Sequence, residues 1–314
     1  MHLKILSGYS GEITLENASF SNIKSRPCIE IEDGCNVDLI LKGNSHLNGI
    51  GISVAPTSTL TTQGDGNLTI ECNDAHYYGI GNTFDSAHGN IIFAHNGTIK
   101  IDGKGNEGIC IGSGLGGAIE IRSGQYNIKC GGTRCTGIGA LFADNSIKIV
   151  NCNMEIDLNS NIGVGIGSLE GASDVYITKS SMLLLGSGNY LSGVGSIGKK
   201  DSVVTIYDAS VEVSLRSNES TCFGSLEGGS ELHTQNVGLK IENAGQHALA
   251  VGGVEQKTKI DLNSTDIRVN VHNSLGVDTY AEDDDISILN GRVKFMVNDQ
   301  SIDRHLEFIH WSED

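Results

Sequence analysis

Apolar and polar residues alternate along most of the chain in short runs, and polar turns separate these runs. One such unit has apolar residues at Ile119 and Ile121, then a turn, then Tyr126, Ile128 and Cys130. The same arrangement returns at residues 147–158 and 260–271. Alternation with a period of two over so few residues is typical of strands that bury one face, not of helices. The pattern therefore predicts many short strands and almost no α-helix.

A second pattern is a tripeptide with an apolar residue between two small ones. Its copies begin at positions 49, 79, 108, 137, 165, 193, 222, 250 and 276, so they recur at a nearly constant interval. A unit of this length with about three short strands cannot bury its apolar face alone. Stacking solves the problem, because each strand then pairs with its equivalents in the neighbouring units. The repeat predicts an all-β solenoid.

The period, the inward columns of Ile, Val and Leu and the column of polar turns carry a family resemblance. In these features the chain resembles the right-handed parallel β-helix proteins, the pectin-lyase-like architecture, over roughly residues 10 to 297. The resemblance implies a right-handed parallel β-helix of about ten coils, with a repeat of roughly 28 to roughly 30 residues. It also implies a bacterial surface protein of the carbohydrate-binding type. It includes no catalytic motif.

Two columns of the repeat predict specific backbone features. The tripeptide glycines predict a crowded corner, where a side chain would clash with the next coil. The turn column consists mostly of residues that accept left-handed conformations. Its members are Asn96, Ser123, Asn151, Lys179, Asp208, Asn236, Ser264 and Asn290.

The extent of the repeat divides the chain into two predicted parts. Residues 1–297 form the repeat domain, and residues 298–314, which contain the only tryptophan, Trp311, form a C-terminal cap. The N-terminus has no visible cap, which is consistent with an upstream domain or a removed signal. Because the chain as given has no signal peptide, its location stays open between the cell surface and the cytoplasm.

The composition of the chain excludes some classes of binding partner. The chain has 314 residues and a formal net charge of -17, which opposes a phosphate backbone, so nucleic acid is not an expected partner. Its longest apolar runs are too short for a membrane span. Eight cysteines contain no CxxC pair, so we expect buried thiols, no metal and no cofactor.

Acidic residues are the candidates for catalysis. Glu170 and Glu227 follow matched Gly-Ser-Leu segments, and Glu255 follows one repeat later. On stacked coils, Glu227 and Glu255 are expected on adjacent rungs about 5 Å apart, and Glu170 about 10 Å from Glu227. These separations overlap those of the carboxylate pairs of glycoside hydrolases. Hydrated surface carboxylates are the alternative interpretation. The acidic run Glu282–Asp285 leaves calcium binding open.

A second candidate site is a patch of histidine and tyrosine around the third and fourth coils. Its residues are His76, Tyr77, Tyr78 and His88, near the largest departure from the regular period. Irregular loops on a regular scaffold are common places for binding, and tyrosine combines an apolar ring with a polar tip that suits a sugar.

Three functions follow from these observations. The first is a non-catalytic scaffold that binds carbohydrate or another surface ligand, which the unbroken period and the lack of long insertions favour. The second is a polysaccharide-active enzyme, a glycoside hydrolase or a lyase. The third is an intracellular ligand-sensing or assembly domain. The fold alone does not choose between them.

Overall fold

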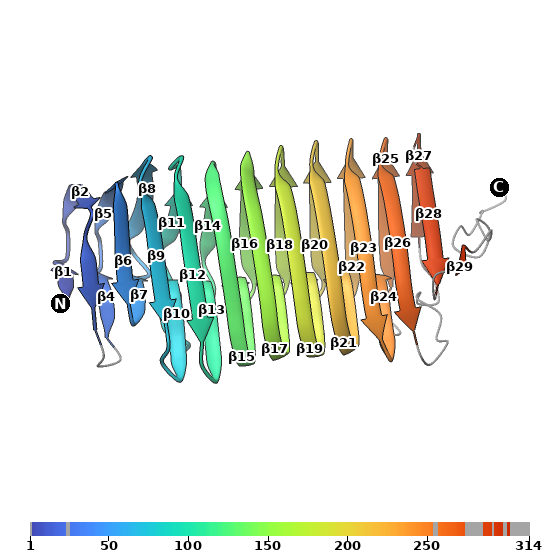
Figure 1. The fold of residues 1–314 in the computed structure, drawn as a ribbon, viewed down its shortest axis with the longest axis horizontal. Coiled ribbons are helices and arrows are strands. Elements are labelled where there is room, and N and C mark those ends of the chain that lie inside the picture. The colour runs from blue at the N-terminus through green and yellow to red at the C-terminus, as the bar shows by residue number, and fades with distance from the viewer. Residues whose placement is uncertain are drawn as a thin grey trace.

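The chain is a rod of stacked coils (Figure 1). The computed structural model describes residues 2–22, 26–253, 257–273, 285–290, 292–297 and 300–301. Within these ranges all regular structure is strand, and no helix occurs. The strands form a parallel β-solenoid of about nine turns, about 28 residues apart. The predicted all-β fold and its period are therefore confirmed. In the described part of the chain, no helix long and apolar enough to cross a membrane is found.

Two sheets run the length of the rod, and nearly all of their neighbouring strands are parallel. The eleven-stranded sheet consists of β2 (Ser10–Glu16), β5 (Asn36–Lys42), β8 (Thr59–Gly64), β11 (Asn90–Phe93), β14 (Ala118–Ile121), β16 (Asn145–Val150), β18 (Ser173–Thr178), β20 (Ser202–Tyr207), β22 (Ser230–Gln235), β25 (Thr258–Asn263) and β27 (Asp285–Leu289).

The second sheet has eighteen strands, and the chain bends within it. Its strands are β1 (Leu3–Ile5), β3 (Ser19–Ser21), β4 (Pro27–Ile31), β6 (Asn44–Asn48), β7 (Ile50–Val54), β9 (Asn67–Cys72), β10 (His76–Gly81), β12 (Thr98–Lys104), β13 (Glu107–Ser113), β15 (Gly124–Ala140), β17 (Cys152–Ser168), β19 (Ser181–Ser196), β21 (Ser210–Ser225), β23 (Gly238–Gly245), β24 (His247–Val251), β26 (Asp266–Asn273), β28 (Arg292–Val297) and β29 (Gln300–Ser301). In β15, β17, β19 and β21 one strand spans the bend, whereas other coils use two shorter strands.

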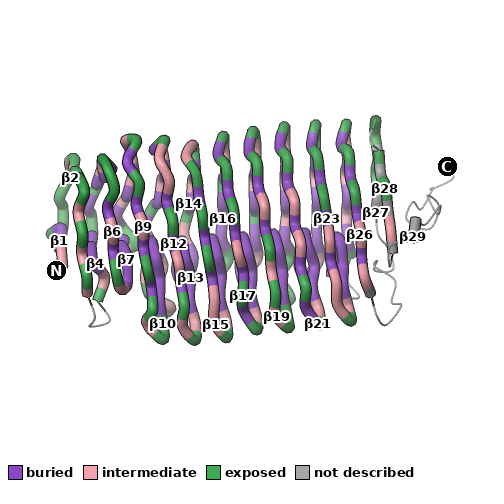
Figure 2. Tube along the Cα trace, in the orientation of Figure 1, coloured by how far each residue is buried: buried purple, intermediate pink, exposed green. Residues whose placement is uncertain are grey.

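The core is a set of mostly aliphatic columns along the rod axis. Figure 2 shows buried positions recurring from coil to coil. Ile156 is fully buried and pairs in register with Ile128 on one side and Leu184 on the other. This column is the one that the alternating pattern predicted. Each apolar side chain is covered by its equivalents in the coils before and after it, which explains why a short repeat folds only as a stack.

The glycine corner is crowded as predicted. Gly139 has a φ of 135°, and a Cβ atom added to it would lie 1.9 Å from the carbonyl oxygen of Gly167 on the next coil. Gly167 makes the same approach to Gly195, at 1.8 Å. Both the backbone conformation and the space exclude a side chain here.

Two of the predicted tripeptide copies are in the wrong register. The structure pairs Ile80 with Ile52 and Ile111, so the equivalent tripeptides are centred on those residues. The predicted copies that begin at residues 49 and 108 therefore lie two residues too early. A shift of two residues keeps the same side chains on the inward face, so the alternating pattern fits both registers.

The turn column adopts left-handed backbone conformations at most of its positions. Asn151, Lys179, Asp208, Asn236, Ser264 and Asn290 have φ values between 49° and 55°. Asn96 and Ser123 do not. In the coil of Ser123, the following residue, Gly124, takes a positive φ of 108°. The prediction thus holds for six of the eight residues.

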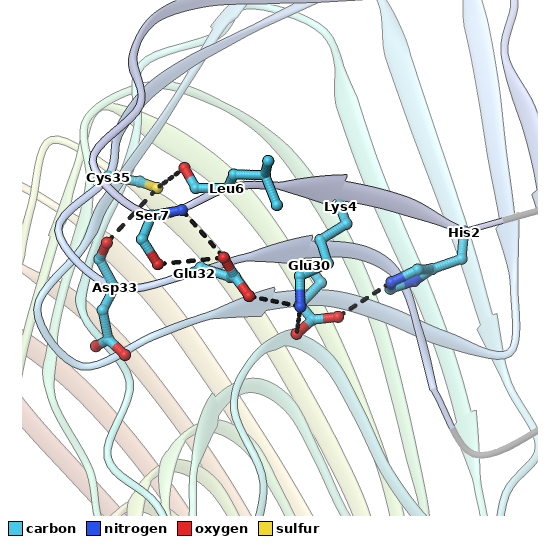
Figure 3. A network of polar contacts seen from close by, with 8 residues as sticks. All are labelled: His2, Lys4, Leu6, Ser7, Glu30, Glu32, Asp33 and Cys35. Atoms are coloured by element: carbon cyan, nitrogen blue, oxygen red, sulfur yellow. Dashed lines mark hydrogen bonds and ion pairs between the residues drawn. The ribbon is translucent and has the colours of Figure 1, made fainter.

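Polar contacts join the first two coils at the N-terminal end (Figure 3). Lys4 Nζ lies 2.5 Å from Glu32 Oε1 and 3.4 Å from Glu30 Oε1, and the backbone amide and hydroxyl of Ser7 donate to Glu32 Oε2. The hydrogen bond from Lys4 lowers the pKa of Glu32. Because these groups are on the surface, they align the rungs more than they stabilise them. The predicted C-terminal cap lies outside the described residues except for β29, which pairs antiparallel with β28.

Candidate functional site

The residues of the predicted histidine and tyrosine patch lie mostly in the core. Only His76 is exposed, and its ring contacts Phe84 edge to face at 5.1 Å between centroids. Tyr77 is fully buried, and Tyr78 and His88 are buried almost completely. Residues 76–81 form β10 instead of a loop, so the alternation turns Tyr77 inward. These side chains do not form a shared surface site.

Tyr77 instead anchors the bend of the solenoid. Its hydroxyl donates to the Gly131 carbonyl at 3.1 Å and accepts from the Gly131 amide at 3.2 Å. Burial raises the pKa of the phenol, so Tyr77 stays neutral. Its ring occupies space that Gly103 and Gly108 leave free, since added Cβ atoms would lie 2.2 Å and 1.9 Å from it.

Two histidines, His88 and His95, are buried in the same region. Burial lowers the pKa of each to about 4, so both are neutral near pH 7. His95 Nδ1 lies 3.3 Å from Thr62 Oγ1, and His88 Nδ1 lies 2.6 Å from the carbonyl oxygen of Gly89. Neither histidine is positioned at a surface where it would meet a substrate.

The predicted carboxylates lie in the turns that follow two long strands, Glu170 after β17 and Glu227 after β21. Backbone hydrogen bonds place Glu170, Gly198 and Glu227 on successive rungs. The two glutamates are therefore two rungs apart, with Gly198 on the rung between them. Glu170 is ion-paired with Arg134 at 2.5 Å, and Arg134 also lies 3.7 Å from Glu107. Glu227 is exposed.

Two other acidic predictions fall largely on undescribed parts of the chain. Glu255 lies outside the described residues, as do residues 282–284 of the acidic run. In the described ranges, no three His, Cys, Asp or Glu side chains are grouped closely enough to hold a metal ion.

All eight cysteines are free and buried. Burial raises the pKa of the Cys110, Cys130 and Cys135 thiols, so they remain protonated. A protonated and inaccessible thiol is a poor nucleophile and a poor metal ligand. The cysteines act as small apolar residues, as the sequence predicted.

A depression that the sequence did not indicate lies on the eleven-stranded sheet, and two tyrosines line it. Its volume is about 390 Å³. Tyr176 on β18 and Tyr207 at the end of β20 are half-buried, with ring centroids 5.7 Å apart in an edge-to-face arrangement. Thr178 pairs in register with Tyr207, so the tyrosines are offset by one rung and two residues. Together with Val150 they expose apolar surface in the depression.

Polar groups surround these rings. Lys179 and Asp208 belong to the left-handed turn column, and Gln235 ends β22 on the next rung. Asp208 Oδ1 accepts a hydrogen bond from Asn236 at 3.1 Å, which fixes its carboxylate. The depression therefore combines apolar rings with an ammonium donor, a carboxylate acceptor and an amide that does both.

One feature of the sequence is consistent with this site, and it concerns outward-facing residues. Tyr176 and Tyr207 are separated by slightly more than one repeat, and both precede a turn. Adjacent rungs bring such residues together, but only the register shows that they share one depression.

Comparison of the chain with protein-family models, curated proteins and solved structures finds no match. The function therefore has to follow from the residues of the site.

Proposed function

We propose that this protein is a β-solenoid scaffold that binds carbohydrate, without turning it over, in the depression of Tyr176 and Tyr207. The observation that carries the proposal is the pair of half-buried rings bordered by Lys179, Asp208 and Gln235. A sugar ring has an apolar C–H face that packs on an aromatic ring, and a rim of hydroxyls that donate and accept hydrogen bonds. An apolar base with a few convergent polar groups is typical of small-ligand sites.

The shape of the fold supports the same proposal. The depression opens along a sheet face with repeating rungs, which suits a chain-like ligand that extends beyond one site. The pectin-lyase-like resemblance and its bacterial surface context belong to this proposal as well.

A glycan array followed by calorimetry on the best ligand tests the proposal. We expect Tyr207→Ala to weaken binding at least about tenfold, because truncating an aromatic anchor costs about 1.4 kcal/mol or more. Tyr207→Phe keeps the ring and should weaken binding less. Tyr190→Ala is the matched control, because Tyr190 is a 41% exposed tyrosine on β19 of the other sheet. Equal affinity of Tyr207→Ala and wild type would exclude this depression.

A turnover assay on the same glycans separates scaffold from enzyme. We expect no cleavage by the wild type. Cleavage that Glu170→Gln or Glu227→Gln reduces by about a hundredfold would instead establish a polysaccharide-active enzyme.

A further inference from the structure

A second depression, of about 480 Å³, lies on the outer face of the eighteen-stranded sheet where the strands bend. It is shallow and is separate from the tyrosine depression, which belongs to the other sheet. Its central residues are Asp102, Lys104, Lys129, Gly131, Asp157 and Asn159.

A missing side chain creates this notch. Gly131 pairs in register with Lys104 on one rung and Asn159 on the next, so the outward column has a gap between two polar side chains. A Cβ atom added to Gly131 would meet its nearest neighbours at 3.4 Å and 3.5 Å, which is ordinary contact, and its φ is not positive. Neither packing nor conformation requires glycine here. A glycine inside a strand weakens it and often marks a place where a ligand approaches the backbone.

The floor of the notch is fixed from below. Both backbone polar groups of Gly131 bond to the hydroxyl of buried Tyr77. The gap is thus held open on a rigid base, which is what a preorganised binding site needs.

The charges around the notch are balanced but not fully paired. Asp102, Lys129 and Asp157 face outward on three successive rungs, and Lys104 donates to Asp102 at 3.1 Å. Lys129 and Asp157 are neighbours in register, yet neither has an ion-pair partner among the described residues.

Some comparable neighbours elsewhere on the rod do pair, whereas others, such as Glu231 and Lys259, do not. Lys148 lies 3.1 Å from Glu120, and Lys240 lies 2.7 Å from Glu212, each across one rung. One ammonium and one carboxylate therefore stand available at the notch, on backbone positions one rung, about 4.8 Å, apart along the axis.

We propose that the notch binds a small zwitterionic amino acid. Its carboxylate pairs with Lys129, its ammonium pairs with Asp157, and its carbon chain lies over Gly131. The two aspartates and two lysines at the notch carry no net charge, so a neutral ligand with separated charges is favoured over a simple anion or cation. This site is independent of the proposed carbohydrate site.

Calorimetry with glycine, β-alanine and γ-aminobutyrate tests the proposal, because the three probes differ in charge separation. Two exposed ion pairs contribute together at most about 2 kcal/mol, so we expect a Kd of about 30 mM for the best probe. Butyrate and n-butylamine each lack one charge of γ-aminobutyrate, and each should bind about fivefold more weakly because it loses one ion pair of about 1 kcal/mol. Failure of all three amino acids to bind at about 100 mM, or binding of butyrate or n-butylamine as tight as that of γ-aminobutyrate, would overturn the proposal.

Variants assign the binding to the notch. Gly131→Leu should abolish binding by filling the gap. Asp157→Asn should weaken the binding of the amino acid at least about fivefold and should strengthen the binding of butyrate. Asp157 is on the surface, so this variant keeps the test decisive if Gly131→Leu fails to fold. Tyr207→Ala is the control and should bind the amino acid as wild type does. Unchanged binding in folded Gly131→Leu, or in Asp157→Asn, would overturn the assignment.

Discussion

The coils of β15–β21 and the coils of β10–β13 solve the same packing problem in different ways. In the first region the central inward column stacks residues of similar size, as Ile128, Ile156 and Leu184 do. In the second, one large side chain, Tyr77, fills space that two glycines on the next coil leave free. Both arrangements reach full burial.

The difference shows how exchangeable the coils are. At one register position, β13 carries Gly108, β15 Cys135, β17 Gly163 and β19 Leu191. A leucine fits in β19 because Gly186 and Gly188 leave it space, since Cβ atoms added to them would lie 3.3 Å and 3.1 Å from its methyl carbons. The size of one residue therefore depends on its neighbours in the stack.

The largest effect is expected in the regular region. Ile156→Asp should prevent folding, because it buries an unpaired carboxylate in the middle of a column at a cost of several kcal/mol. Circular dichroism and solubility of the purified chain measure this. A soluble variant that melts like the wild type would contradict the register of the column.

A smaller effect is expected from making the irregular region resemble the regular one. Gly108→Leu should destabilise the protein by about 3 kcal/mol, because its side chain overlaps the ring of Tyr77. Adding Tyr77→Ala removes the ring that the new leucine overlaps, so it should recover part of the lost stability. The leucine should also fill the space that the ring leaves, so the double variant should be more stable than Tyr77→Ala alone. Denaturant unfolding of the four proteins gives the coupling energy. Simple additivity would show that the two sites do not compete for space.

The smallest effect depends on pH and belongs to the irregular region alone. The pKa of His95 is about 4 in the folded protein and about 6.5 in the unfolded chain. Between these values the unfolded chain binds more protons, so stability falls as the pH falls and is complete above about pH 6.5. At pH 5.5 the loss is about 1.4 kcal/mol for this histidine.

The variant His95→Gln isolates that contribution. Its unfolding free energy should fall less than that of the wild type between pH 7 and pH 5, measured by urea denaturation. Tyr190→Phe, in the regular region, serves as the control and should follow the wild-type profile. Parallel profiles for wild type and His95→Gln would contradict the neutral buried histidine.

The sequence was sufficient to predict the regular region, since alternation and period together define which side chains face inward. It was insufficient where a two-residue shift leaves that alternation intact, as at Ile111, because the register there depends on backbone pairing. The irregular period around Tyr77 predicts a loop, but residues 76–81 form β10, in which every residue after His76 is buried, so no alternation of apolar and polar residues marks this strand. Tyr176 and Tyr207 meet across an offset of one rung and two residues. The spacing of equivalent positions along the sequence does not reveal such a contact.

The stacking of coils that touch only their neighbours also has a mechanical consequence. Ile166 and Val194 occupy equivalent places one coil apart, so deleting positions 167–194 would join two matching ends. The rod would shorten by one rung, about 4.8 Å, and each remaining strand would still pair with an equivalent strand of the neighbouring coil. Under tension at its ends, such a rod should yield one coil at a time, in many small steps instead of a single rupture.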